Sequence, residues 1–120
     1  MSGITGFDHI AIAVPDLDAQ VERLTEAFGM TVQGRSERYA LLADPVSGFK
    51  IEMNQADGGE ARFRHLGFCT ADVDGEHNAL LDAGMAEVEG PHRRDFARMR
   101  TSFLREANGL EFQLVKYDSE

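Results

Sequence analysis

The sequence predicts an α+β fold built from two βαβββ modules, and three observations carry this prediction. First, "FDHIAIAVPDLD", which begins at Phe7, nearly repeats as "FRHLGFCTADVD" from Phe63. Second, each copy alternates like a β-strand and then reaches an aspartate that can cap a helix. Third, a glycine closes each helical pattern, and short alternating stretches follow it. A repeat on this scale indicates two equivalent structural units within one chain.

The elements can be placed in order within a single domain of residues 1–120, with modules at residues 1–55 and 63–120. Each module opens with the repeated strand. The first helix is expected at about residues 16–28, where Leu17, Val21, Leu24 and Phe28 recur at helical spacing. The second is expected at about residues 72–83. The remaining predicted strands are residues 31–34, 38–43, 49–54, 86–89, 98–105 and 110–117, with turns at "DPVSG" (44–48), "EGP" (89–91) and "ANG" (107–109) and a polar linker at 54–62.

Composition and charge narrow the functional class. The net charge is −9, from 21 acidic and 12 basic residues, so binding to nucleic acid or to an anionic membrane surface is not expected. The single cysteine, Cys69, cannot form an internal disulfide. Neither a secretory signal nor a membrane-spanning segment is expected from the sequence. These features favour a cytoplasmic protein.

Both repeated strands place a histidine on a face of small residues. Side chains of a strand alternate between two faces, so parity shows which residues share a face. Small neighbours leave room beside the imidazole for another group. The histidine faces comprise His9 with Ala11 and Ala13, and His65 with Gly67 and Cys69.

The last strand of each module carries polar residues on one face in the same way. These strands could bring His9, Glu52 and His65 onto one concave surface, together with Gln113 or Glu111. Two imidazoles with carboxylate or amide oxygens form a binding set for a divalent transition metal. Because the repeat places the histidines equivalently, packing alone explains the pattern poorly.

The chain resembles the vicinal oxygen chelate superfamily, which includes glyoxalase I, methylmalonyl-CoA epimerase, extradiol dioxygenases and bleomycin- and fosfomycin-resistance proteins. The resemblance covers essentially the whole chain and rests on the two repeated openings and on "DPVSGFKIE" and "EANGLEFQLV". It implies that the paired modules form a cup-shaped, partly open mixed β-sheet with the helices outside. It also implies a divalent metal (Ni, Co, Zn, Mn or Fe) bound by the first and last strand of each module.

The resemblance implies specific ligands. His9 and His65 match the first-strand ligands, and Glu52 stands four residues after Gly48, where the first-module carboxylate belongs. Gln113 stands four residues after Gly109, where the family commonly has Glu. Gln113 is therefore the favoured fourth ligand, and Glu111 is the alternative if the register slips by two residues.

The expected activity is that of a metal-dependent lyase or isomerase of the glyoxalase I or epimerase type. It would act on a small molecule with vicinal oxygens through a metal-stabilised enediolate, with Glu52 or Glu111 as the base. One alternative is a small-molecule (antibiotic or toxin) binding or resistance protein without chemistry. Another is a non-haem iron dioxygenase.

Other residues are candidates for contact with the substrate. Arg98 and Arg100 are expected to share a strand face and could hold a carboxylate or phosphate. Tyr39 and Phe103 could line the cup, whereas His77 is expected to pack under its helix. Open modules leave strand edges exposed, which favours a homodimer.

Overall fold

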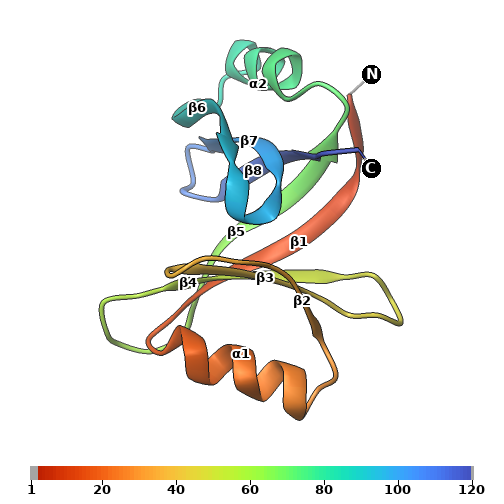
Figure 1. Ribbon diagram of the computed structural model, residues 1–120. Helices are drawn as coiled ribbons and strands as arrows, with labels where there is room; N and C mark the ends of the chain where they lie inside the picture. Colours follow the sequence, from red (N-terminus) through yellow and green to blue (C-terminus); the bar gives the residue numbers. More distant parts are fainter. Residues whose placement is uncertain (1–2, 120) are drawn as a thin grey trace. The chain divides into compact units, whose positions relative to one another are not determined.

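The computed structural model describes residues 3–119. Two compact units divide the chain: the first unit is residues 9–64, and the second combines the residues up to Asp8 with those from His65 onward. The elements in chain order are β1 (Ile4–Val14), α1 (Leu17–Glu26), β2 (Thr31–Arg35), β3 (Tyr39–Ala43), β4 (Lys50–Gln55), β5 (Arg62–Thr70), α2 (Val73–Asp82), β6 (Ala86–Arg94), the 3₁₀ turn η1 (Asp95–Ala97), β7 (Met99–Arg105) and β8 (Glu111–Tyr117) (Figure 1).

The two units have the same sheet topology. In the first unit the strand order is β2-β3-β4-β1, and in the second it is β6-β7-β8-β5. The pairs β1–β4 and β5–β8 are parallel, and every other neighbouring pair within a unit is antiparallel. The predicted α+β class and the two βαβββ modules are therefore confirmed.

Equivalent aspartates begin the two helices. Asp16 and Asp72 have nearly the same extended backbone, with φ of −141° in both. The Asp16 carboxylate accepts a hydrogen bond from the Ala19 amide, and the Asp72 carboxylate accepts one from the Gly75 amide. Each bond satisfies an amide that the first turn of a helix leaves without a partner. The repeat in the sequence thus corresponds to a repeated helix start.

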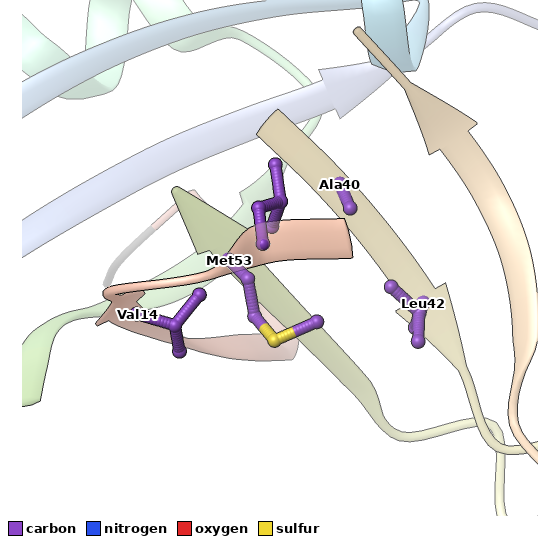
Figure 2. Packing of buried hydrophobic residues seen from close by; sticks show 5 residues of the cluster. Val14, Ala40, Leu42 and Met53 are labelled. Carbon is purple, nitrogen blue, oxygen red and sulfur yellow. The ribbon is translucent and has the colours of Figure 1, made fainter. Parts of the chain in front are cut away.

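An apolar cluster joins α1 to one face of its sheet, which we call the helix face. Figure 2 shows four of its side chains, Val14, Ala40, Leu42 and Met53, which come from β1, β3 and β4. Leu17 of α1 completes the buried set, and Val21 and Leu24 pack against it half-buried. The apolar stripe of the helical pattern is therefore confirmed up to Leu24. Phe28 lies beyond the end of α1 and is 71% exposed, so its predicted place in the stripe is wrong.

The helix face of the second unit is partly polar. Leu104 and Leu114 pack with Val73 of α2. His77 is buried under the helix, as predicted, and it makes two hydrogen bonds there. Its Nε2 donates to Glu87 Oε1 at 2.7 Å, which leaves Nδ1 to accept from the Ser102 hydroxyl at 2.8 Å.

Strand β6 is longer than the sequence suggested. The "EGP" segment, Glu89–Pro91, was expected to be a turn, but it lies inside β6, which runs to Arg94. The pairing of β6 with β7 shifts register between Glu87 and Glu89 and again between Glu89 and His92. The turn prediction is therefore wrong, because these residues form bulges within a strand. The chain reverses later, at η1.

Candidate metal centre

The first unit buries His9 beside Glu52. Strand β1 lies parallel to β4 with Ala11 opposite Glu52, so His9, two residues before Ala11, points to the same face as the carboxylate. We call this side of each sheet the ligand face. His9 Nε2 lies 4.0 Å from Glu52 Oε2, and the two residues are 0% and 3% exposed. Burying a carboxylate beside an imidazole is costly in free energy unless the charge is compensated.

A tight turn sets the position of Glu52. Gly48 has a φ of +80°, which glycine adopts without strain, and its amide donates to the Asp44 carbonyl. The Asp44 carboxylate accepts from the Ser47 hydroxyl and from the Val46 amide, and these bonds lower the pKa of Asp44. The turn ends where β4 begins, so it fixes which strand residues reach the ligand face.

The second unit repeats this arrangement with His65 and Gln113. Strand β5 lies parallel to β8 with Gly67 opposite Gln113, so His65 and the amide share the ligand face. His65 Nε2 and Gln113 Oε1 are 2.8 Å apart, and the residues are 5% and 0% exposed. Two ligand atoms that each lie about 2.1 Å from one metal ion, and that subtend about a right angle at it, are about 3 Å apart. The spacing suits a shared ion as well as a hydrogen bond.

The sheet register distinguishes Gln113 from Glu111 as the counterpart of Glu52. Glu52 lies opposite Leu41 of β3, and Gln113 lies opposite Phe103 of β7. Both stand opposite the residue two positions after the strand histidine. Gln113 therefore occupies the Glu52 position, and Glu111 is two residues earlier on the same face.

Thr101 orients the Gln113 amide. The Thr101 hydroxyl donates to the Leu114 carbonyl at 2.6 Å, so its oxygen is left to accept. Gln113 Nε2 donates to that oxygen at 2.8 Å. Because the nitrogen of the amide is held by Thr101, the oxygen points toward His65. Sequence reasoning missed Thr101, although its parity with Phe103 in the predicted strand places it on the ligand face.

Glu111 lies on the other side of the His65 ring. Its Oε2 is 3.9 Å from His65 Nδ1, and its Oε1 accepts from Arg105 at 3.1 Å. The separation from Nδ1 is too long for a hydrogen bond, so the interaction is electrostatic. Gln113 Oε1 can only accept, so Nε2 carries the proton of the hydrogen bond between them in the metal-free protein. If a metal took the place of that proton, the Glu111 carboxylate would favour a proton on Nδ1.

The structure places two of the predicted substrate-binding residues, Phe103 and Tyr39, on the ligand face, but it does not place Arg98 and Arg100 on one strand face. Phe103 lies on the ligand face, where its ring meets the edge of the His65 ring with 5.1 Å between centroids. Tyr39 is opposite Asn54, two residues after Glu52, and so lies on the ligand face of the first unit. Arg98 precedes β7 and has a φ of +51°, so it shares no strand face with Arg100.

Arg100 is engaged on the helix side of the second unit. Its guanidinium donates twice to the Asp74 carboxylate, at 2.8 and 3.0 Å. This pairing lowers the pKa of Asp74 and raises that of Arg100. The side chain therefore leads away from Gln113, since Arg100 is the neighbour of Thr101 and points to the opposite face.

The donor chemistry of both pairs fits a divalent ion. Each unit supplies one imidazole nitrogen and one oxygen, from a carboxylate in the first unit and from an amide in the second. Imidazole and oxygen ligands of this kind suit Zn, Ni, Co, Mn and Fe.

Comparisons with known proteins agree with this architecture. Residues 6–114 match the model of the Glyoxalase/Bleomycin resistance protein/Dioxygenase superfamily. No curated protein gives a significant match. A methylmalonyl-CoA epimerase from Mycobacterium tuberculosis is similar in structure, with 27% identity, 99% of this chain and 92% of that chain covered, and a TM-score of 0.84.

A second similar structure is a Streptomyces coelicolor methylmalonyl-CoA epimerase variant in complex with 2-nitronate-propionyl-CoA. It is 26% identical, with 97% of this chain and 99% of that chain covered and a TM-score of 0.79. Neither helix among residues 3–119 has the length and hydropathy needed to cross a membrane. The family match, which spans most of the chain, shows that this protein belongs to the Glyoxalase/Bleomycin resistance protein/Dioxygenase superfamily.

Proposed function

We propose that the protein is a metal-dependent isomerase of the epimerase type. In this proposal His9 and Glu52 of the first unit and His65 and Gln113 of the second hold one divalent ion. The substrate is a small molecule with neighbouring oxygens, and the reaction removes and returns a proton on a carbon next to a carbonyl. A homodimer remains a prediction.

The observation that carries the proposal is the repeated pairing of a buried imidazole with a buried oxygen donor. In both units Nε2 of the histidine faces the oxygen, at 4.0 Å in the first and 2.8 Å in the second. A purely structural histidine has no reason to recur at the same register position with the same partner type. The recurrence is explained if each unit supplies half of the residues that hold one ion.

The residues divide the chemistry among them. When bound, the ion would act as a Lewis acid that stabilises negative charge on the carbonyl oxygen. Glu52, through Oε2, would take the proton from carbon, and delivery of a proton to the opposite face of the carbon would complete the epimerisation. Glu111, held by Arg105, would keep the proton of His65 on Nδ1. The neutral Gln113 amide would leave Glu52 as the only carboxylate among the four ligands.

The similar structures support a class of substrate. Both are methylmalonyl-CoA epimerases, and each match covers 97% or more of this chain. An acyl-CoA thioester with an acidic hydrogen between two carbonyl carbons is therefore the first substrate to test.

The test combines metal content with proton exchange. Untagged protein is analysed for bound metal and then incubated with methylmalonyl-CoA in D₂O, where mass spectrometry follows deuterium at the carbon between the carbonyls. We expect near-stoichiometric metal and enzyme-dependent exchange. Glu52→Gln should slow exchange at least about 100-fold, the usual contribution of a general base. Glu60→Gln, which changes an exposed glutamate in the loop before β5, is the matched control.

Two outcomes would contradict the proposal. Wild-type protein that binds none of nickel, cobalt, zinc, manganese or ferrous iron would favour a binding protein without chemistry. Metal-loaded protein that consumes oxygen with a catechol, but exchanges no proton, would favour a dioxygenase.

A further inference from the structure

We propose that Arg94 is the residue that recognises a carboxylate on the substrate, next to His65 and Gln113. This inference rests on the proposed function and names a substrate feature of the same site. It concerns the second unit alone, where every contact used below is found.

The second of two register shifts in β6 returns Arg94 to the ligand face. Glu89 pairs with Phe103 and therefore lies on that face. With regular alternation, Arg94, five residues later, would point to the opposite side. The register shift between Glu89 and His92 reverses the parity, so that Arg94 pairs with Met99. Met99 has the same parity as Thr101 and Phe103, which places Arg94 on the ligand face.

The neighbouring residue, Arg93, lies on the opposite face of the sheet. Arg93 pairs with Arg100, on the helix face of the sheet. Its guanidinium donates to both oxygens of Asp118, at 2.8 and 2.6 Å, and to Asp95 at 2.8 Å. Those bonds raise the pKa of Arg93. Arg93 is therefore held by two carboxylates on the helix face, whereas the adjacent Arg94 lies on the ligand face.

The Phe103 ring links Arg94 to the metal ligands. The Arg94 guanidinium carbon lies 4.9 Å from the centre of the ring, at cation–π distance. The same ring meets His65 edge-on, and Phe103 stands opposite Gln113. The Arg94 side chain is 17% exposed. A partly buried guanidinium next to a candidate metal ligand suits the two-point recognition of a carboxylate.

His92 holds the guanidinium in place. Its Nδ1 lies 2.8 Å from the Gly90 carbonyl, which can only accept, so the proton is on Nδ1. Its Nε2 is then an acceptor, and Arg94 Nε donates to it at 3.1 Å. This bond engages Nε and so fixes the orientation of the planar guanidinium. Glu89, at 3.4 Å from Arg94 Nη2, is the carboxylate that a substrate anion would replace or join.

The experiment compares two substrates that differ in one group. Methylmalonyl-CoA carries a carboxylate, and 2-methylacetoacetyl-CoA carries a neutral acetyl group in its place. Deuterium exchange in D₂O is measured for both with the wild type, Arg94→Met and Arg93→Gln. Methionine retains much of the packing on Phe103 without the charge. Arg93→Gln removes one charge from the adjacent, oppositely facing position.

We expect Arg94→Met to lower kcat/KM for methylmalonyl-CoA about 10- to 100-fold, mostly through KM, because a charge-assisted hydrogen bond is lost. Exchange of 2-methylacetoacetyl-CoA should change less than about threefold, which also reports that the variant is folded. Arg93→Gln should leave the ratio between the two substrates unchanged.

Equal losses for both substrates in Arg94→Met would overturn the inference, since a structural role does not depend on the carboxylate. An undiminished kcat/KM for methylmalonyl-CoA in Arg94→Met would overturn it as well. In either case exchange by the wild type would leave the proposed function intact. Absence of exchange with either substrate in the metal-loaded wild type would refute both proposals together.

Discussion

The helix face of the first unit is apolar at the positions where that of the second unit is polar. Ala40 in β3 and Ser102 in β7 are equivalent, since each precedes the residue opposite Glu52 or Gln113. Val21 of α1 corresponds to His77 of α2 through the repeat. Alanine and valine pack in the first unit, whereas serine and histidine form a hydrogen-bonded network with Glu87 in the second.

This difference shows which features the repeat must keep. A buried polar network is compatible with a core when each of its members is satisfied, and here His77 bonds at both ring nitrogens. The strand histidines, by contrast, recur in both units with an oxygen donor beside them. The helix face can therefore change its chemistry, while the ligand face keeps the same plan.

Exchanging the polar network for the apolar pair is the strongest test of this comparison. His77→Val alone removes the buried imidazole from between its two partners and leaves the Ser102 hydroxyl, which is 0% exposed, without its acceptor. We expect a loss of about 2 to 3 kcal/mol in the free energy of unfolding. Urea denaturation followed by circular dichroism measures it.

The double variant His77→Val/Ser102→Ala reproduces the residues of the first unit. Removing both groups leaves no buried hydroxyl unsatisfied, so the double variant should lose about 1 to 2 kcal/mol less than the sum of the single variants. Strict additivity would show that the network contributes nothing beyond its separate residues.

A second test makes the ligand pair of the second unit identical in type to that of the first. Gln113→Glu replaces the amide nitrogen, which donates to Thr101, by an oxygen that cannot donate. We expect the metal-free protein to lose about 1 to 2 kcal/mol of stability. Added metal should raise the melting temperature of this variant more than that of the wild type, because a carboxylate binds a cation more strongly than an amide does. Thermal melts with and without metal check both parts, and equal metal responses would argue against Gln113 as a ligand.

Thr101→Val tests the orientation of the amide with a smaller change. Valine has nearly the shape of threonine but cannot accept from Gln113 Nε2. Stability should fall by about 1 kcal/mol, and metal affinity by about 10-fold, as when a residue that orients a ligand is removed. Titration with zinc in a calorimeter gives the affinity. An unchanged affinity would mean that the amide needs no support from Thr101.

The smallest expected effect concerns the ion pair at the start of α2. Arg100 lowers the pKa of Asp74 from its ordinary value of 3.8, so the pair stabilises the folded state above that value. The contribution is lost as the pH falls through the lowered pKa. Arg100→Gln should therefore be slightly less stable than the wild type near neutral pH, and this difference should disappear in acid. Both groups are exposed, so solvent screens the effect.

Melting curves between pH 2 and 7 would show the convergence of the two proteins. Arg62→Gln, an exposed substitution in β5, controls for the loss of one positive charge. A difference that stayed constant down to the lowest pH would point to packing by the Arg100 side chain instead.

Most residues of the ligand face could be predicted from strand parity and from the glycines in the turns. The sequence alone gives the two modules, the capping aspartates Asp16 and Asp72, and the shared parity of each histidine with its small neighbours. Gly48 and Gly109 also gave the spacing to Glu52 and Gln113. These features are local, since alternation and positive φ act over a few residues and are visible without knowledge of distant contacts.

Only the tertiary structure decided which arginine and which polar residues serve each face. The pairing of β6 with β7 places Arg94 opposite Met99 on the ligand face and Arg93 opposite Arg100 on the helix face. The His77 network likewise joins a helix to two strands far along the chain. Parity counted along a single strand cannot reveal a residue inserted into its ladder, because the register of that ladder is set by non-local pairing.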